Sequence, residues 1–209
     1  MNAPLKHAEI FQLPLANHPK LEVTIARTLN ELMEVMAVRT LVYVGEQTCP
    51  FDEEYDGNDF CGATHFLLRA NGEPVGALRL RWFNDFVKLE RVAVRREHRG
   101  GPGAIALVRA AFDLAERKGY QRMLGHAQVR LVPFWKRHFN FEPRQGRQPF
   151  VFSDHEYVEI EAPVGSSVSG DDTISIDSDP LVLLRPEGEW HFPGVLDRSS
   201  RRTATNPGA

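Results

Sequence analysis

The stretch RVAVRREHRGGPGAIAL, residues 91–107, passes from an alternating apolar run through a glycine-rich turn into a helical pattern. Glycine lets backbone amides approach an anion closely, because no Cβ atom intervenes. The N-terminus of the following helix adds unpaired N–H donors and a partial positive charge, which favour phosphate. Pro102 has no N–H to donate, but its fixed φ suits a first helical turn. The stretch predicts either an anion-binding corner or a tight strand-to-helix connection without a ligand.

The residues just before this stretch predict an antiparallel meander. Two apolar runs within residues 65–83 lie on either side of Asn71-Gly72, which is a strong hairpin signal. The pair Asn84-Asp85 forms a second turn, and residues 86–94 form the next alternating run.

The N-terminal part predicts one strand, one helix and one long loop. Alternation over residues 21–26 indicates a half-buried strand. Thr28 and Glu31 form a capping-box pattern at the start of a helix over about 28–44. Residues 45–63 have no periodicity and carry six acidic residues, so we expect a loop. Loops of this length in a compact domain are usually functional.

Helical and strand patterns alternate after the glycine-rich turn. We expect a helix at 103–118, a strand at 123–129, a short helix at 131–139 and closing strands within 149–162. The order of elements indicates a mixed α/β (α+β) domain. The predicted organisation is an N-terminal arm, one domain, a polar linker and an apolar C-terminal extension that docks on its own domain or on a second subunit: residues 1–19, 20–164, 165–180 and 181–209.

Composition narrows the class of protein. The 209 residues are 42% hydrophobic and 25% charged with a net charge of −3, which is typical of globular domains and unlike most nucleic-acid binders. Apolar runs stay shorter than the roughly 18 residues of a membrane helix, and the N-terminus does not resemble a secretion signal. Cys49 and Cys61 match no zinc pattern, and we expect two buried free thiols, no metal and a cytoplasmic location.

The motif at the glycine-rich turn resembles the central motif of the GNAT acyltransferase superfamily. That motif is usually written Arg/Gln-x-x-Gly-x-Gly/Ala and follows an apolar strand, here Val92-Ala93-Val94. Arg99 and Ala104 match it, whereas Pro102 stands where the first glycine belongs.

Segments on both sides support the resemblance. Phe134-Trp135 and Asn140-Phe141 stand where the family has a Phe-Tyr pair followed by a Gly-Phe pair. Upstream, residues 38–60 resemble the ElaA-like bacterial branch, including a Cys-Pro pair and the closely spaced acids Asp56 and Asp59. The resemblance implies a mainly antiparallel twisted sheet flanked by helices.

The resemblance also implies acetyl-CoA or another acyl-CoA as co-substrate. The diphosphate would bind amides of the turn, and the pantetheine arm would run beside strand 86–94 where it parts from strand 123–129. The implied coenzyme-binding residues are Val92, Ala93, Val94, Arg99, Gly100, Gly101, Gly103, Ala104, Phe134 and Trp135.

The reaction of such an enzyme needs a neutral amine, an oxyanion donor and a route for the thiolate. Because alkylamines have a pKa of about 10.4, a base assists at neutral pH. Glu90 and His126 are the candidate bases, and a backbone N–H near Val92 is the candidate oxyanion donor. Trp135 occupies the position where many members of the family have a Tyr that protonates the leaving thiolate. An indole N–H hardly ionises, so the general acid stays unassigned.

Arg39 is informative on its own. Helical spacing puts it on an apolar face, where a buried guanidinium needs a carboxylate partner. The candidates are Glu46, Glu54, Asp56 and Asp59. In one interpretation, an ion pair of Arg39 with these acids only holds the loop in place. In the other, Arg39 or its acidic partners line a pocket for the acceptor substrate. The substrate-binding residues would then be Arg39, Tyr43, Glu54, Asp56, Asp59 and Gln128.

Three functions remain open at this level. The first is an N-acyltransferase that acts on a small-molecule amine, with a homodimer as a possible assembly. The run Glu54-Tyr55-Asp56-Gly57-Asn58-Asp59, after Arg39 and before Arg79, also resembles acyl-homoserine-lactone synthases and N-acyl amino acid synthases. The third is a coenzyme A-binding module without catalysis, which the missing Tyr and Pro102 both allow.

Overall fold

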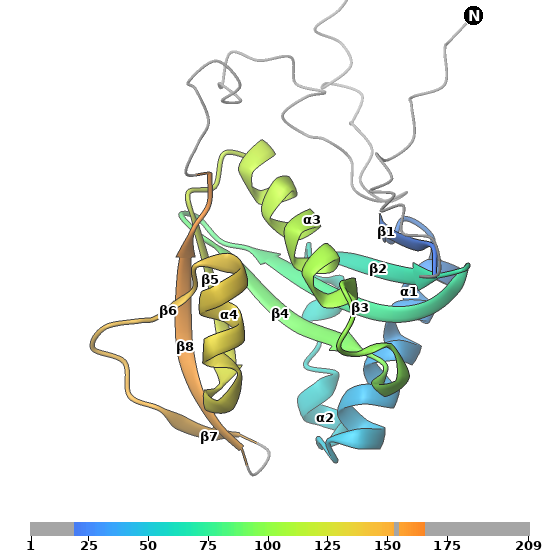
Figure 1. The fold of residues 1–209 in the computed structure, drawn as a ribbon, viewed down its shortest axis with the longest axis horizontal. Helices are drawn as coiled ribbons and strands as arrows, with labels where there is room; N and C mark the ends of the chain where they lie inside the picture. Colours follow the sequence, from blue (N-terminus) through green and yellow to red (C-terminus); the bar gives the residue numbers. More distant parts are fainter. Residues whose placement is uncertain (1–18, 153–154, 166–209) are drawn as a thin grey trace, which may run out of the picture.

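A computed structural model describes residues 19–152 and 155–165. One sheet runs through this part of the chain in the order β1-β2-β3-β4-β5-β8-β6, with β7 paired to β8 (Figure 1). β4 and β5 are parallel, and the other neighbours are antiparallel. The mixed, mainly antiparallel sheet is therefore confirmed. The strands are β1 Leu21–Ile25, β2 Thr64–Ala70, β3 Glu73–Trp82, β4 Val87–Val94, β5 Arg122–Gln128, β6 Glu142–Pro143, β7 Phe150–Phe152 and β8 His155–Pro163.

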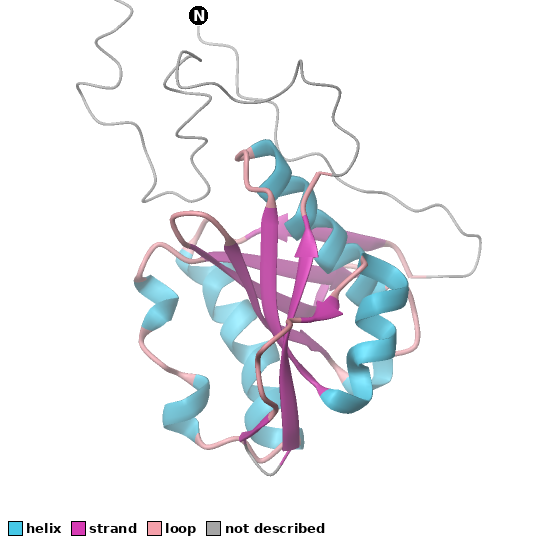
Figure 2. Cartoon of the chain, turned by 90° about the vertical axis from the view of Figure 1, so that its left-hand side faces the viewer, coloured by secondary structure: helices cyan, strands magenta, loops and turns pink. Residues whose placement is uncertain are grey.

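Helices cover both faces of the sheet (Figures 1 and 2). The α-helices are α1 Leu29–Arg39, α2 Phe51–Glu54, α3 Gly103–Arg117 and α4 Val132–Phe139. A π-helix Thr40–Glu46 continues α1, and three 3₁₀ turns lie at Asn58–Phe60, Arg96–His98 and Val129–Leu131.

Two apolar clusters fill the spaces between the sheet and its helices. Alternate residues of β2 point to opposite faces. Phe66 and Leu68 pack in the larger cluster with α3 and α4, whereas Leu67 packs in the smaller one with Val35 and Val38 of α1. The central strands are buried on both faces and hold the functional site on a rigid scaffold.

Local signals at two sites are confirmed. Thr28 Oγ1 accepts a hydrogen bond from the Glu31 amide, and the Glu31 carboxylate accepts one from the Thr28 amide, which completes the capping box. Asn71 and Gly72 have φ of 51° and 87° and form the turn between β2 and β3. These left-handed values are what the Asn-Gly pair favours.

Two predictions of local structure are confirmed only in part. The helix expected over 28–44 is α-helical only to Arg39 and then widens into the π-helix; the Thr40 hydroxyl donates to the Met36 carbonyl at this junction. Such side-chain bonding competes with the regular helical ladder. The expected loop over 45–63 contains α2 and a 3₁₀ turn. Cys49 is buried as expected, but Cys61 is exposed.

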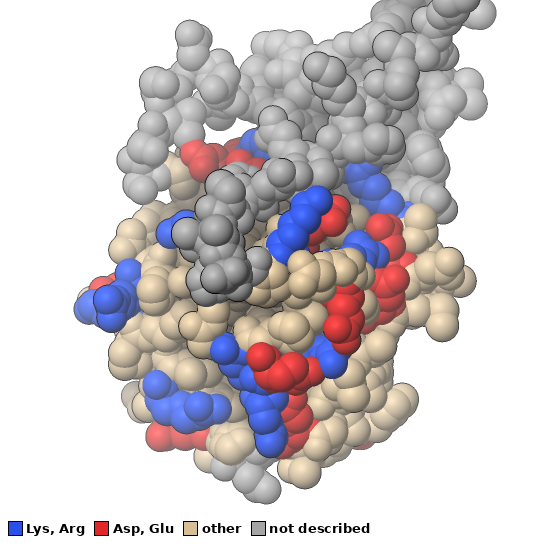
Figure 3. All heavy atoms as spheres, turned by 45° about the vertical axis from the view of Figure 1, so that its right-hand side comes forward, with Lys and Arg blue, Asp and Glu red and all other residues tan. Residues whose placement is uncertain are grey.

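The predicted arm, linker and extension lie outside the described residues, apart from residues 19 and 165. On the face shown in Figure 3, the described acidic and basic side chains are interspersed, as the small net charge suggests. No helix in residues 19–152 and 155–165 is long and apolar enough to cross a membrane.

Candidate active site

The site begins where the two parallel strands part (Figure 1). β4 and β5 pair only from Val87–Leu89 to Met123–Gly125, although both strands continue further. A β-bulge in the β3–β4 pairing follows directly, and Arg91 within it has a φ of 53°. An extra residue bends a strand and strengthens its twist. The bulge therefore turns the end of β4 away from β5 and opens the sheet.

The open edge of β4 presents backbone donors. The Arg95 amide donates to the Val75 carbonyl of β3, so by strand alternation the polar groups of Val92 and Val94 face the opening. Their carbonyls are already engaged, because Tyr43 Oη donates to Val92 O at 2.8 Å and Arg99 Nε donates to Val94 O at 2.7 Å. Burial raises the pKa of Tyr43, so its hydroxyl stays protonated. The amides of Val92 and Val94 point toward the same edge.

The N-terminus of α3 lies beyond the end of β4. The first hydrogen bond in this turn joins the Ala106 amide to the Pro102 carbonyl, which leaves the preceding amides without a helical partner. Gly100 has a φ of 80°, and a Cβ at Gly103 would lie 2.8 Å from Leu68 Cδ2. Gly100 is therefore required by its backbone conformation, and Gly103 is required by the lack of space for a Cβ atom.

Arg99 lies differently from the motif-based expectation. Its amide donates to the Arg96 carbonyl at 3.2 Å, and its Nη2 lies 2.7 Å from Glu46 Oε2. The turn thus leaves the amides of Gly100, Gly101, Gly103 and Ala104 for an anion, while Arg99 fixes the loop to the π-helix.

Two buried arginines organise the other side of the opening. Arg39 and Arg79 are both 0% exposed. Arg39 contacts Glu54 at 2.5 Å and Asp59 at 2.6 Å. The expected partnership of Arg39 with the acidic loop is thereby confirmed for Glu54 and Asp59, whereas Glu46 pairs with Arg99 and Asp56 with Arg79.

Arg79 extends these contacts into β4. Its guanidinium lies within 2.9 Å of Asp56, Asp59 and Glu90. The hydrogen bond from Arg79 holds the pKa of Asp56 well below its usual range. Burial alone would raise the pKa of Glu90, but Lys88 and Arg79 outweigh it and lower the pKa.

Arg91 and Lys88 complete this set of ion pairs. Arg91 Nε lies 2.8 Å from Glu54 Oε2, and Lys88 Nζ lies 2.8 Å from Glu90 Oε1. We call the four cations and four carboxylates the ion-pair cluster: Arg39, Arg79, Lys88, Arg91, Glu54, Asp56, Asp59 and Glu90. Because a buried charge without a partner costs several kcal/mol, the cluster fixes the loop 51–60 against β3 and β4.

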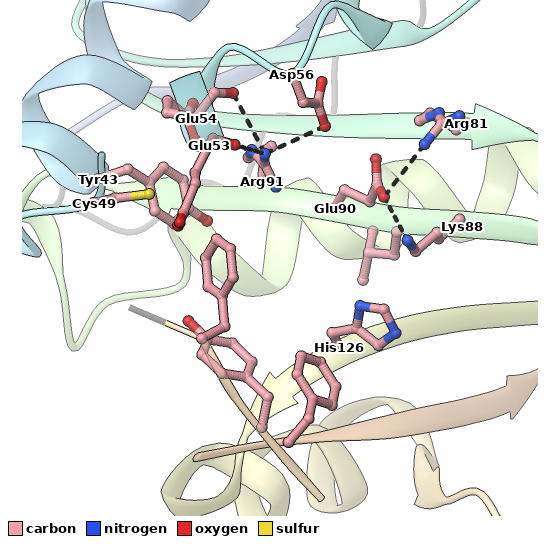
Figure 4. A pocket seen from close by; sticks show the side chains of 14 residues that line it. Tyr43, Cys49, Glu53, Glu54, Asp56, Arg81, Lys88, Glu90, Arg91 and His126 are labelled. Atoms are coloured by element: carbon pink, nitrogen blue, oxygen red, sulfur yellow. Dashed lines mark hydrogen bonds and ion pairs between the residues drawn. The ribbon is translucent and has the colours of Figure 1, made fainter. Parts of the chain in front are cut away.

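Two cavities meet at this cluster. A cavity of about 120 Å³ lies between the parted strands, and one of about 360 Å³ lies beside the acidic loop (Figure 4). They share the residues Tyr43, Leu89, Glu90, Arg91, His126 and Tyr157. A ligand reaching through the strands and a second ligand beside the loop would therefore meet at these residues.

His126 lies at this junction, and its nearest carboxylate is beyond hydrogen-bond distance. Its Nε2 is 3.8 Å from Glu159. Burial, followed by the charge of Lys88, lowers its pKa. The imidazole is thus neutral at neutral pH and able to accept a proton.

The remaining expected residues have supporting positions. Trp135 is buried against Phe139 and Phe141, with Phe134 packed on the same cluster. Asn140 adopts the left-handed φ of 57° at the end of α4, which explains how Asn replaces the family's glycine. Gln128 is buried and donates to Tyr157 Oη at 3.1 Å.

Arg81 and Tyr157 are site residues that the sequence analysis missed. Both line the larger cavity. Arg79 and Arg81 alternate along β3, so a period of two already places them on one face. Tyr157 lies in β8, where no local pattern indicates a site. Among the described residues, no group of three or more His, Cys, Asp or Glu could hold a metal ion.

Comparisons with known proteins agree with this geometry. The model of the acetyltransferase (GNAT) family matches residues 29–141. YjcF of Bacillus subtilis, named as an uncharacterized N-acetyltransferase, is 34% identical over 119 residues, covering 56% of this chain and 84% of YjcF.

Two solved structures share the fold. An acyl-CoA N-acyltransferase from Pseudomonas aeruginosa is 26% identical with a TM-score of 0.62, covering 68% of this chain and 99% of that one. Escherichia coli ElaA is 22% identical with a TM-score of 0.61 and the same coverage. The family match spans more than half of the chain, from the start of α1 to two residues after α4, and the chain is thus an acyltransferase that belongs to the acetyltransferase (GNAT) family.

Proposed function

We propose that this protein transfers an acyl group, most simply acetyl, from a coenzyme A thioester to the amine of a small molecule in a ternary complex. The observation that carries the proposal is the opening between β4 and β5, which leads from free amides at the start of α3 to the junction of two cavities.

The residues of the opening fit the coenzyme. The amides of Gly100, Gly101, Gly103 and Ala104 would hold its diphosphate, since a helix N-terminus favours anions. The amide of Val94 would bind a pantetheine carbonyl along β4. When bound, the thioester supplies an activated acyl carbon and a thiolate leaving group.

His126 is the proposed general base. It is neutral, borders both cavities and would take the proton that the attacking amine loses. Glu90 is the weaker candidate, because Arg79 occupies its Oε2 and Lys88 its Oε1. We assign Glu90 to holding β3 and β4 together beside the reacting amine. The amide of Val92, next to the bulge, is the proposed donor to the thioester oxygen.

Release of free coenzyme A, measured with acetyl-CoA and longer acyl-CoAs over a panel of amines, tests the proposal. We expect turnover that depends on both substrates. Turnover of acyl-carrier-protein thioesters alone would favour a signal-synthase activity instead. Tight coenzyme A binding without turnover of any amine would indicate a binding module and refute the proposal.

A further inference from the structure

Arg81 lines the larger cavity without a close carboxylate partner in the described part of the chain. Its side chain is 26% exposed, and its nearest carboxylate oxygen, on Glu90, lies 3.9 Å away. Within residues 19–152 and 155–165, its guanidinium has no hydrogen-bond acceptor. Glu90 is already engaged by Arg79 and Lys88. Five N–H donors on a mostly buried side chain are therefore available to a ligand.

The position of Arg81 is fixed. Its guanidinium carbon lies 5.2 Å from the centroid of the Phe83 ring, and this ring stacks on Phe86. A guanidinium held over an aromatic face loses little conformational freedom when it binds a planar anion. The Arg81 guanidinium is thus preorganised to bind a planar anion in the cavity.

Lys88 adds a second positive charge at the same end. Arg81 and Lys88 are direct cross-strand neighbours on β3 and β4. Like charges in this arrangement repel each other, and one carboxylate, Glu90, lies between them (Figure 4). At this end of the cavity two cations, Arg81 and Lys88, share one carboxylate, Glu90, so the end carries one surplus positive charge, while Glu53 lies at the opposite end.

The cavity is polarised from end to end. Figure 4 shows Arg81, Lys88 and His126 on one side and Glu53, Glu54 and Tyr43 on the other. Three aromatic side chains, Phe150, Phe152 and Tyr157, line the same cavity. Its volume of about 360 Å³ matches a small molecule rather than a protein segment.

We infer that the acceptor is an amino acid with an apolar or aromatic side chain, whose carboxylate pairs with Arg81 while its amine faces His126. This inference rests on the proposed function and names its substrate class. The carboxylate supplies the missing acceptor for Arg81, and the aromatic wall receives the side chain. In the transfer, the nitrogen of the neutral amine bonds to the acyl carbon, the carbon–sulfur bond breaks with its electron pair on the thiolate, and the one proton that the nitrogen loses passes to His126.

Two acceptors that differ only in the carboxylate test the inference. We expect acetyl-CoA-dependent kcat/KM to be about 10-fold or more higher for phenylalanine than for phenethylamine, because a site built around a polar group rejects the analogue that lacks it. Arg81→Gln should lower kcat/KM for phenylalanine by about 10- to 100-fold, as expected for a lost charge-assisted pair. The same variant should leave phenethylamine within about 2-fold, and Arg81→Lys should restore part of the loss.

Arg69→Gln is the matched control. Arg69 is half-buried on β2 and pairs with Glu34, away from the cavity. It should change neither acceptor's kinetics. Equal losses for both acceptors in Arg81→Gln, or a wild-type enzyme that accepts phenethylamine as well as phenylalanine, would overturn the inference.

Equilibrium binding separates this inference from the proposed function. N-acetylphenylalanine and N-acetylphenethylamine are titrated into the full chain and into Arg81→Gln, with no turnover required. Tighter binding of the carboxylate compound, lost in Arg81→Gln, supports the anion site even if no amine is acylated. Equal binding of the two compounds refutes the anion site even if acyl transfer is observed.

Discussion

The two sides of the opening use charge in opposite ways. On the acceptor side, eight charged side chains pair with one another in the ion-pair cluster. On the proposed coenzyme side, the groups that we expect to face the ligand are neutral backbone amides at β4 and α3. Paired charges hold a shape, whereas the groups left without partners are the ones available for binding and chemistry.

The comparison changes which residues count as functional. Glu54, Asp56 and Asp59 are the acids that the sequence highlights, and all three neutralise buried arginines. His126 and Arg81 have longer ion-pair distances, 3.8 and 3.9 Å, and are the groups that we propose to act on the substrate. Variants on the two sides should therefore differ in kind, with losses of stability on one side and losses of activity on the other.

The largest effect is expected from Arg79→Met. This change leaves Asp56, Asp59 and Glu90 without their common partner, and removing one member of a buried ion pair costs about 3–5 kcal/mol. Urea denaturation at neutral pH measures the loss in free energy of unfolding.

Arg122→Met is the control for that experiment. Arg122 pairs with Asp85 at 2.6 Å on the surface, where ion pairs contribute about 0–1 kcal/mol. If both variants lose the same stability, the cluster is not the structural element that we describe.

A smaller effect, on activity alone, is expected from His126→Gln. Loss of a general base lowers kcat by about 100-fold, while the half-exposed position leaves the fold intact. Because the pKa of His126 is lowered from 6.5, kcat in the wild type should fall only as the pH drops below 6.5. The residual activity of the variant should lack this acidic limb.

His138→Gln, an exposed histidine on α4, controls for the loss of an imidazole elsewhere. An acidic limb that persists unchanged in His126→Gln would move the base to another group, with Glu90 the first to test.

Sequence patterns predicted what depends on neighbours along the chain. The capping box at Thr28, the Asn71-Gly72 hairpin and the start of α3 follow from local geometry. The burial of Arg39 followed from helical period, and its need for a carboxylate followed from electrostatics.

Which carboxylate pairs with which arginine could not be predicted from the sequence. Four acids after Arg39 satisfy the same requirement, and only the path of the chain through α2 decides that Glu54 and Asp59 meet it while Asp56 meets Arg79. The availability of Arg81 is harder still to predict, since it results from the pairing of every other charge nearby.

The smallest effect is expected from alanine substitutions at two glycines near the start of α3, Gly103 and Gly101. A Cβ at Gly103 would lie 2.8 Å from Leu68 Cδ2, and Leu68 is buried. Gly103→Ala should therefore lower the free energy of unfolding by about 1–3 kcal/mol, as overpacking does, as measured by urea denaturation.

Gly101→Ala is the matched change two residues earlier. Its Cβ would meet nothing nearer than the His98 carbonyl at 4.0 Å, so the fold should be unaffected. If the amides here hold a diphosphate, the added methyl group should still weaken coenzyme A binding, because it lies where the backbone must approach an anion. Calorimetric titration measures the affinity for coenzyme A of Gly101→Ala and of the unchanged protein. Unchanged affinity in Gly101→Ala would mean that the glycines serve only the turn, and that the diphosphate binds elsewhere.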